Sequence, residues 1–287
     1  MSGQSESVGT ASAPASSANI GPGFDAVALA FEIRCVCKAT LSDRWLVAEL
    51  GTEFEPQPHE LVRRAMAAAV GERPVRLEID NAIPRSRGLG SSSAVAVAAA
   101  AAAQRAFGRE PSSEELFAIA NELEGHPDNA AAAVYGGLVV ASGDVMRQLP
   151  LAPNLVFIAA IPDEKLSTHK ARAALPAQIS HAAAARSVAR ALMLIEGLRT
   201  GDPEPLRSAA GDELHELPRA ELSPVTADLI VAAYDAGAFH AGWSGAGPST
   251  LAITDEAGKQ PVIDACTKLL DDRGLVTELD VATDGWR

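Results

Sequence analysis

The amino-acid sequence predicts an α+β fold with two lobes. Segments with strand periodicity and segments with helix periodicity are intermixed along the chain, without the regular βαβ alternation of a doubly wound sheet. A length of 287 residues allows one large domain or two small ones around a substantial core. A loop around Pro150–Asn154 separates two groups of elements. We therefore predict an N-terminal lobe of residues 1–150 and a C-terminal lobe of residues 151–287.

The elements of the first lobe follow from its hydrophobic periodicity. Apolar and polar residues alternate from Phe31 to Thr40 and again from Val75 to Asp80, which predicts two half-buried strands. The segment Glu60–Val70 between them has helical spacing. The elements that follow are a long alanine-rich helix from about Ser91 to Phe107, a helix opened by a Ser112–Glu115 capping box and running through Leu123, a helix from about Pro127 to the glycines at 136–137, and a strand over Leu138–Ala141.

The second lobe is predicted to contain more helix, with strands near its two ends. Its first strand spans Leu155–Ile161. Helices are expected over residues 168–175, 182–198, 203–212, 223–236 and 260–272, and further strands over 239–243, 250–254 and 275–281.

Composition and charge exclude several classes of function. The net charge is −13 and the chain has no basic patch, so nucleic-acid binding is disfavoured. No strongly apolar run of about 18 residues occurs, so no membrane span is expected. The first ten residues, MSGQSESVGT, lack the features of a signal peptide, and we interpret them as a disordered lead-in of a cytoplasmic protein. Cys35, Cys37 and Cys266 form no metal-type pair and are expected in the core.

The most informative motif is PRSRGLGSSSA, residues 84–94, which leads directly into the alanine-rich helix. Gly88 and Gly90 permit a tight turn and a close approach of the backbone to a ligand. The first helical N–H groups, from about Ser91 to Ala94, have no intrahelical acceptor, and the helix dipole adds positive potential. The motif therefore predicts a phosphate cradle, although it is not a Walker loop. The alternative is an ordinary N-cap on a buried helix.

Two further glycine-rich segments favour the phosphate cradle. They read APASSANIGPGFDAVALAF, residues 13–31, and HAGWSGAGPSTLAI, residues 240–253. In order and spacing, the three segments resemble the signature motifs of the GHMP small-molecule kinases, and the resemblance covers nearly the whole chain. The stretch PASSANIGPGFD is most similar to that of the members that phosphorylate homoserine. The resemblance implies the GHMP kinase fold, in which the N-terminal lobe is like ribosomal protein S5 and the C-terminal lobe is ferredoxin-like.

The resemblance implies that ATP and Mg2+ bind at the cradle. The nucleotide-binding positions that it implies are Pro84, Arg87, Gly88, Leu89, Gly90, Ser91, Ser92, Ser93 and Ala94. The family holds its magnesium through a serine of the glycine loop and a glutamate of a GELEG stretch. These positions fall on Ser92, with Ser91 as the alternative, and on Glu122 in NELEG, with Glu124 as the competing carboxylate. Carboxylate and hydroxyl oxygens are ligands that Mg2+ prefers.

The same resemblance implies a site for a small amino acid. The substrate-binding positions are Asn19, Asp25, His126, Asn129, Thr168, Arg172 and Arg219. Asp25 resembles the residue that receives the substrate ammonium, and a guanidinium suits a carboxylate because it binds it through two parallel hydrogen bonds. Asp128 is the candidate general base. An ordinary aspartate is a weak base at neutral pH, so its role is either to orient the hydroxyl or to act as a weak base.

We therefore expect ATP-dependent phosphorylation of L-homoserine to O-phospho-L-homoserine, a step toward threonine. Asp128, Glu122 and Ser92 are the expected catalytic residues. One alternative is another GHMP kinase, acting on shikimate, mevalonate or a diphosphocytidyl polyol. A second alternative is a catalytically inactive relative that senses a metabolite. The expected partners are small molecules, and a homodimer stays open because relatives commonly form one.

Overall fold

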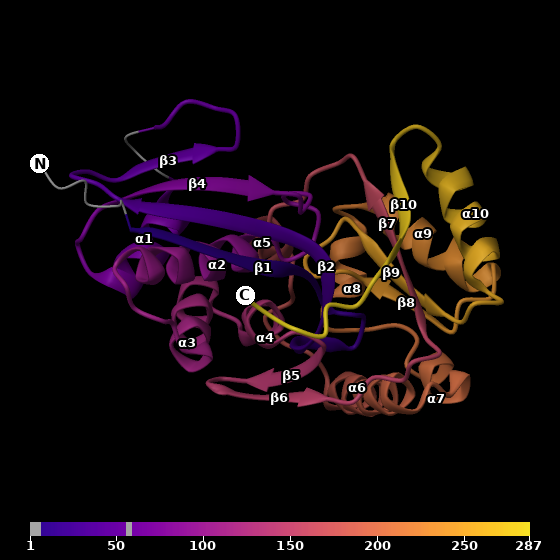
Figure 1. Cartoon of the computed structure of the whole chain (residues 1–287). Coiled ribbons are helices and arrows are strands. Elements are labelled where there is room, and N and C mark those ends of the chain that lie inside the picture. Colours follow the sequence, from indigo (N-terminus) through magenta and orange to yellow (C-terminus); the bar gives the residue numbers. More distant parts are fainter. Residues whose placement is uncertain (1–6, 56–58) are drawn as a thin grey trace, which may run out of the picture.

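The computed structural model describes residues 7–55 and 59–287, and two β-sheets organise it (Figure 1). In the first sheet the strand order is β3-β4-β2-β5-β6, with β1 paired to β2; in the second it is β10-β7-β9-β8. The strands of the first sheet are β1 (Val8–Asn19), β2 (Gly23–Leu41), β3 (Leu46–Glu49), β4 (Val75–Asn81), β5 (Leu138–Ser142) and β6 (Val145–Leu149). Those of the second are β7 (Val156–Pro162), β8 (His240–Trp243), β9 (Thr250–Thr254) and β10 (Gly274–Leu279).

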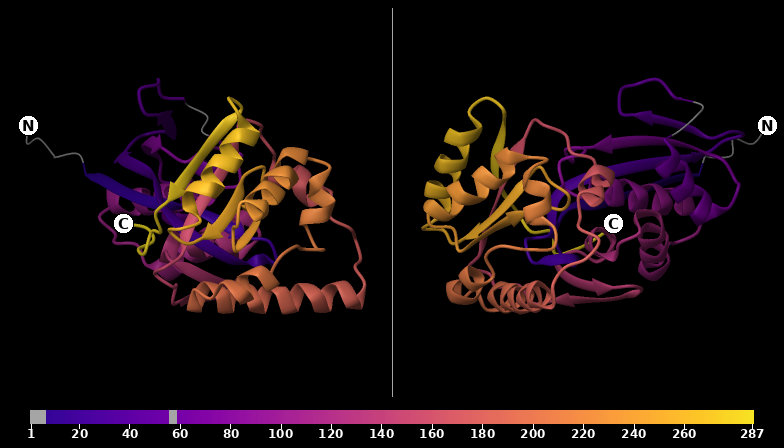
Figure 2. Two further views of the ribbon diagram at one scale, coloured as in Figure 1. Left: turned by 90° about the vertical axis from the view of Figure 1, so that its right-hand side faces the viewer. Right: turned by 180° about the vertical axis from the view of Figure 1, so that it is seen from behind.

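Helices cover one face of each sheet, and α6 runs along the outside of the molecule (Figure 2). Those of the first lobe are α1 (Glu60–Val70), α2 (Ser91–Ala106), α3 (Ser113–Glu124) and α4 (Pro127–Tyr135). Those that follow are α5 (Thr168–Ala173), α6 (His181–Thr200), α7 (Pro203–Ser208), α8 (Glu216–Ala220), α9 (Pro224–Asp235) and α10 (Lys259–Leu270). The predicted α+β class is confirmed, and every helix that the sequence predicted is present within a few residues.

Helix α2 lies at the centre of the first lobe, packed against β1 and β2. Every residue from Ser93 to Gln104 is buried, because alanine side chains are short enough to let neighbouring backbones approach on all sides. Gly9 of β1 shows how close the approach is, since a Cβ atom there would collide with the carbonyl oxygen of Ala102. This packing fixes the position of the α2 N-terminus, which carries the phosphate-loop motif.

Strand β2 has the predicted alternation, and strand β1 was not predicted. Cys35 and Cys37 are buried on one face of β2, as expected. The predicted disordered lead-in is wrong for Val8–Thr10, which begin β1, whereas residues 1–6 lie outside the described part of the chain. The β1 sequence consists mostly of small residues without clear alternation, so its extended conformation depends on pairing with β2.

The end of the chain returns to the first lobe after β10 (Figure 1). Ser12 and Arg287 exchange two main-chain hydrogen bonds of 2.9 Å each. The indole nitrogen of Trp286 donates to the hydroxyl of Ser113 at 3.0 Å. The division at residue 150 stays a prediction, because the largest buried cluster also joins Phe31 to Phe157 across it. No helix in the described part of the chain is both long and apolar enough to cross a membrane.

Candidate active site

A cavity of about 850 Å³ is lined by residues of both lobes. Its wall combines the phosphate-loop motif, the segment between β3 and α1, the start of α4, helix α5, Arg219 of α8 and the turn after β8. The predicted site residues on this wall are Asn19, Asp25, Pro84, Gly88, Leu89, Gly90, Ser91, Ser92, His126, Asp128, Asn129, Thr168, Arg172 and Arg219. Residues distant in sequence therefore meet around one space.

The three glycine-rich motifs contact one another directly beside this cavity. The Ser244 hydroxyl donates to the carbonyl oxygen of Gly88 at 2.7 Å, and the Ser16 amide donates to that of Leu89 at 3.1 Å. Gly88 and Gly90 have φ values of 78° and 66°. A Cβ atom on Gly88 would collide with the Ser244 carbonyl, and one on Gly90 with the Ser16 hydroxyl. Glycine is required at both positions by conformation and by contact.

The phosphate end of the cavity is the N-terminus of α2. Gly90 is the N-cap, so the amides of Ser91, Ser92 and Ser93 have no acceptor within the helix. Ser91 and Ser92 line the cavity, and the Ser91 hydroxyl accepts a hydrogen bond from Asn81 at 3.0 Å. The side chains of Ser93 and Ala94 are buried in the core, so these two residues could contribute only their main chain to nucleotide binding. The Ala94 amide is already used, since it donates to Gly90 at 3.0 Å.

Arg87 also departs from its predicted nucleotide-binding role, because its side chain is not part of the described cavity wall. Its guanidinium donates to three main-chain carbonyls instead, those of Arg85 at 2.9 Å, Pro162 at 3.2 Å and Asp163 at 2.6 Å. These acceptors hold the side chain beside the end of β7.

One part of the wall that sequence reasoning missed is apolar and adjoins the phosphate loop. It is formed by Val47 of β3, Phe54, Val62 of α1, Ile79 of β4 and Val95 of α2. Phe54 is held from behind by the guanidinium of Arg76, whose central carbon lies 3.8 Å from the ring centroid. A run of apolar residues in Leu46–Ala48 was the available signal, but it is too short to distinguish a strand from a loop.

At the other end of the cavity, Asp25 and Arg172 form a bidentate ion pair. The two guanidinium nitrogens of Arg172 lie 3.0 and 2.7 Å from the two carboxylate oxygens of Asp25. Asp25 has a φ of 52°, and its amide donates to the side chain of Asn19 at 2.9 Å. The hydrogen bonds to Asp25 raise the pKa of Arg172, against the opposing effect of burial. Both side chains are about one-third exposed to the cavity, at 36% and 31%.

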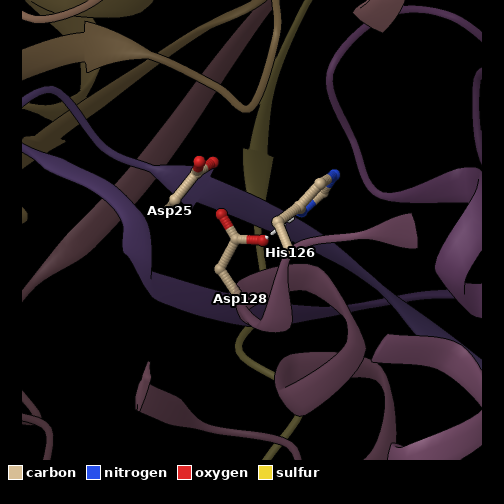
Figure 3. Close-up of side chains that lie close together, drawn as sticks. All are labelled: Asp25, His126 and Asp128. Carbon is tan, nitrogen blue, oxygen red and sulfur yellow. Dashed lines mark hydrogen bonds and ion pairs between the residues drawn. The ribbon is translucent and has the colours of Figure 1, made fainter. Parts of the chain in front are cut away.

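Asp128, in the first turn of α4, lies between Asp25 and His126, with one carboxylate oxygen directed toward each (Figure 3). One polar atom of each of the three side chains lies within 4.8 Å of the other two. The ring nitrogen Nδ1 of His126 lies 2.6 Å from a carboxylate oxygen of Asp128, and both residues are buried. Burial lowers the pKa of His126, but the hydrogen bond and the negative charge of Asp128 outweigh it, so the pKa is raised. Asn129, the next residue, accepts a hydrogen bond from Ser16 at 2.8 Å.

Arg219 lies in the wall between these groups without a direct ion-pair contact to a carboxylate, although Asp25, Asp212 and Glu216 are near enough to act on its charge. It is 1% exposed, and within residues 7–55 and 59–287 no carboxylate oxygen lies within 4.0 Å of its nitrogens. Its guanidinium donates to the carbonyls of Ala171 at 3.3 Å and Gly245 at 3.2 Å, and to Nδ1 of His215 at 3.0 Å. Burial, together with the nearby charge of Arg172, lowers the pKa of Arg219 to about 10.

His215 was not predicted as a site residue, although it precedes Arg219 by one helical turn. Because an arginine always donates, Nδ1 of His215 accepts, and Nε2 donates to the carbonyl of Gly21 at 2.7 Å. Burial lowers the pKa of His215 to about 4, so the ring is neutral. It also stacks on Phe24, with ring centroids 5.0 Å apart. His215 thus joins Arg219 to the turn that presents Asp25.

Of the two candidate metal carboxylates, Glu124 lines the described cavity and Glu122 does not. Glu122 is exposed at the outside of α3, whereas Glu124 lines the cavity and its side chain is 12% exposed. Oxygen Oε1 of Glu124 is buried and has no hydrogen-bond partner among the described residues. Residues two apart on a helix point about 200° apart, so at most one of the two can face the cavity.

Comparison with known proteins places this cavity in a family. Family models match two parts of the chain, GHMP kinases N terminal domain at residues 59–137 and GHMP kinases C terminal at residues 194–272. A homoserine kinase of Deinococcus radiodurans is 38% identical over 261 residues, which are 87% of this chain and 85% of that protein. The chain belongs to the GHMP kinases. The resemblance noted in its three motifs is confirmed.

Other relatives of this GHMP kinase agree. A homoserine kinase of Mycolicibacterium paratuberculosis is 38% identical and covers 89% of this chain and 87% of its own length. The crystal structure of a homoserine kinase from Cytophaga hutchinsonii superimposes with a TM-score of 0.86 at 28% identity, covering 100% of this chain and 99% of that one. The mevalonate kinase of Methanococcus jannaschii, at 14% identity and a TM-score of 0.72 over 98% of this chain and all of that one, shares the fold.

Proposed function

We propose that this GHMP kinase transfers the γ-phosphoryl group of ATP to the side-chain hydroxyl of L-homoserine, forming O-phospho-L-homoserine. The observation that carries the proposal is the acceptor end of the cavity, where the Asp25 carboxylate lies beside the guanidinium groups of Arg172 and Arg219. An α-amino acid carries one ammonium and one carboxylate, and this set of charges matches both. The curated relatives named above are homoserine kinases.

On binding, the acceptor would replace the ion pair between Asp25 and Arg172 with two ion pairs of its own. Its ammonium would bind Asp25, with the side chain of Asn19 holding the turn in place through the Asp25 amide. Its carboxylate would bind Arg219 and Arg172. Among the described residues Arg219 has no directly bound carboxylate, and Arg172 adds a second positive charge beside it, so this buried guanidinium favours an anionic ligand.

ATP would bind across the other end. The first amides of α2 and its dipole suit the phosphates, and the glycines at 88 and 90 allow close approach. The apolar wall that includes Val47, Phe54 and Val62 suits a planar base. This arrangement concentrates positive potential locally in a chain whose net charge is −13.

The residues present also fit Mg2+. Glu124 has a buried oxygen with no hydrogen-bond partner in the described part of the chain, and Ser92 and Ser91 line the same cavity. These are hard oxygen donors, which Mg2+ prefers. When bound, the ion would neutralise phosphate charge in phosphoryl transfer, which depends mainly on positioning and electrostatics. We therefore propose Glu124 and Ser92 as its ligands, with Ser91 as the alternative.

Asp128 would orient the attacking hydroxyl. It is 1% exposed, and the imidazole of His126 holds one of its carboxylate oxygens at 2.6 Å. The same contact raises the pKa of His126. A carboxylate in this position can accept a hydrogen bond from the acceptor's hydroxyl group and so align the attacking oxygen. Weak base catalysis is the alternative role.

The two rival functions leave features of the site unexplained. A neutral polyol would leave the charges of Arg172 and Arg219 without a ligand partner. A metabolite sensor would need neither the unpartnered oxygen of Glu124 nor a hydroxyl-orienting carboxylate at Asp128. Both features favour a kinase for an amino acid.

An assay of ADP release tests the proposal, with Mg2+ and ATP and with L-homoserine, L-threonine, shikimate or mevalonate as acceptor. We expect turnover with L-homoserine and its loss when EDTA removes Mg2+. Turnover with shikimate or mevalonate alone would contradict the acceptor assignment and keep the kinase. Nucleotide binding without turnover of any acceptor would favour the sensor.

A further inference from the structure

We propose that Arg87 is a positioning residue that holds the acceptor-binding loop against the phosphate loop. The loop, Asp163–Ser167, connects β7 to α5, and α5 carries Thr168 and Arg172. The inference rests on the proposed function in one respect only, that Arg172 binds the acceptor. We infer that Arg87 affects how tightly the acceptor binds, although it belongs to the motif that is proposed to bind phosphate.

The guanidinium of Arg87 joins three pieces of main chain. It donates to the carbonyl of Arg85 in its own loop at 2.9 Å, to that of Pro162 at the end of β7 at 3.2 Å, and to that of Asp163 at 2.6 Å. Each of its three nitrogens has its own acceptor, which uses the planar fork of an arginine and which a lysine cannot reproduce. The main chain of Arg87 is held as well, because its carbonyl accepts from the Ser249 amide at 3.4 Å.

A second contact fixes the far part of the acceptor-binding loop. The Leu166 amide donates to the carbonyl of Ser86 at 3.1 Å. Ser86 has a φ of 58°, a conformation that a serine adopts only at a cost and that aims this carbonyl at the loop. The Leu166 side chain is buried against Ala171 and Trp243. Two adjacent residues of the phosphate loop therefore hold the start and the end of the acceptor-binding loop.

Loss of the Arg87 side chain should act on the acceptor and not on the nucleotide. The side chain points toward the end of β7 and is not part of the described cavity wall. Without it, Asp163 loses its contact with the phosphate loop, while the amides of α2 stay in place. Arg172 keeps its ion pair with Asp25, and the loop keeps the Leu166 contact and the 2.9 Å hydrogen bond from the Asp163 amide to the Arg273 carbonyl. The loop is then held to the phosphate loop at one point instead of two, and a displacement of about 1 Å in a reacting group can change a rate by about a hundredfold.

The test compares Arg87→Met and Arg87→Lys with Arg34→Met. Arg34 of β2 is the matched control because its guanidinium also binds main-chain carbonyls, those of Asp284 and Gly285 at 3.0 Å each, beside the chain end and away from the acceptor-binding loop. For each variant, the measurements are the KM for L-homoserine, the Kd for ADP, the melting temperature and the hydrogen exchange of residues 163–172.

For Arg87→Met we expect the KM for L-homoserine to rise about tenfold or more, because hydrogen bonds from a charged group are lost. The Kd for ADP should change less than about twofold, and residues 163–172 should exchange faster. Arg87→Lys should restore part of the KM. Arg34→Met should lower the melting temperature without changing the KM or the exchange of that segment.

Two results would overturn the inference. Weaker ADP binding with an unchanged acceptor KM would make Arg87 a nucleotide-binding residue. Unchanged exchange of residues 163–172 in Arg87→Met would mean that Arg87 does not hold this loop. If the unsubstituted protein does not turn over L-homoserine, the proposed function fails, and the exchange comparison still decides the role of Arg87.

Discussion

The two ends of the cavity are built from different materials. The phosphate end is mainly backbone: two glycines with positive φ, the first amides of α2, and the main chain of neighbouring motifs pressed against them. The acceptor end consists of charged side chains from β2, α4, α5 and α8, among which Asp25 and Arg172 neutralise each other. The backbone end binds anions through geometry, whereas the acceptor end selects by charge and must exchange an ion pair for its ligand.

The comparison predicts that removing a charge matters most at the acceptor end. Arg172→Ala should raise the KM for L-homoserine by about a hundredfold to a thousandfold, because truncating one partner of a charge pair costs about 2–5 kcal/mol in a closed site. The Kd for ADP should stay within about twofold. Steady-state kinetics and calorimetry measure the two constants. An unchanged KM would remove Arg172 from the acceptor site.

At the phosphate end, which is built from backbone, we expect an added methyl group to disturb activity more than the loss of a charge. Gly88→Ala places a Cβ atom against the Ser244 carbonyl and should lower kcat/KM by about a hundredfold through displacement of the phosphate loop. Gly108→Ala is the control, because Gly108 has a φ of 71° with nothing within 4 Å of a Cβ atom there. It carries the conformational strain alone, at about 1 kcal/mol of stability. Similar activities of the two variants would show that the collision is harmless.

The proposed Mg2+ ligand can be tested by comparing Glu124 with its neighbour Glu122. Glu124→Gln should raise the Mg2+ concentration required for half-maximal activity about tenfold or more, since a charged ligand becomes neutral. Glu122→Gln should leave it unchanged, because Glu122 is exposed outside the described cavity wall. Titration of activity with Mg2+ measures both. The reverse ranking would return the assignment to Glu122.

The smallest expected effect is on the free energy of unfolding, through Glu216, which is buried near Arg219. Burial raises the pKa of Glu216 to about 7, and its carboxylate accepts from the Trp243 amide at 2.8 Å. The folded state therefore retains a proton that the unfolded state loses, and this group's contribution to stability falls as pH rises from about 4.5 to 7. Glu216→Gln keeps the acceptor and removes the charge, so it should stabilise the protein by up to about 3 kcal/mol above pH 7.

Two buried histidines act in the opposite direction and provide the contrast. Burial lowers the pKa values of His215 and His240 to about 4, so the unfolded state binds protons that the folded state does not. Their contribution to stability is complete above about pH 6.5 and is lost as pH falls toward 4.

Urea unfolding from pH 5 to 8 measures the effect of Glu216→Gln. The stability gained by this variant should grow with pH and level off above pH 7. Glu221→Gln, at an exposed position, should follow the unsubstituted protein.

The same contrast explains how far the sequence could predict the molecule. The phosphate end was predictable, because two glycines, three serines and a helix start lie within one short segment. Most acceptor residues came from resemblance, since nothing local indicates that Asp25 and Arg172, 147 positions apart, form an ion pair. The contacts of Arg87 were not predictable either, because two of its three acceptors, Pro162 and Asp163, lie 75 and 76 positions along the chain.

Glu122 and Glu124 show a second limit. Both belong to the last turn of α3, and the sequence does not specify which side of that turn faces the cavity. The helix ends at Gly125 with a φ of 76°, and the chain then enters α4 through His126, which sets the direction of the turn. This orientation depends on packing between α3 and α4, which periodicity alone does not determine.

The most direct measurement compares kcat/KM for L-homoserine with that for two analogues that each lack one charge. These are 2-aminobutane-1,4-diol, which lacks the carboxylate, and 4-hydroxybutanoate, which lacks the ammonium. The diol would leave Arg172 and Arg219 without a carboxylate, and 4-hydroxybutanoate would leave Asp25 without an ammonium, once the ion pair has opened. We expect kcat/KM to fall about a hundredfold or more for each analogue. An analogue that is used within a few-fold of L-homoserine would contradict the account of an acceptor end that selects a zwitterion.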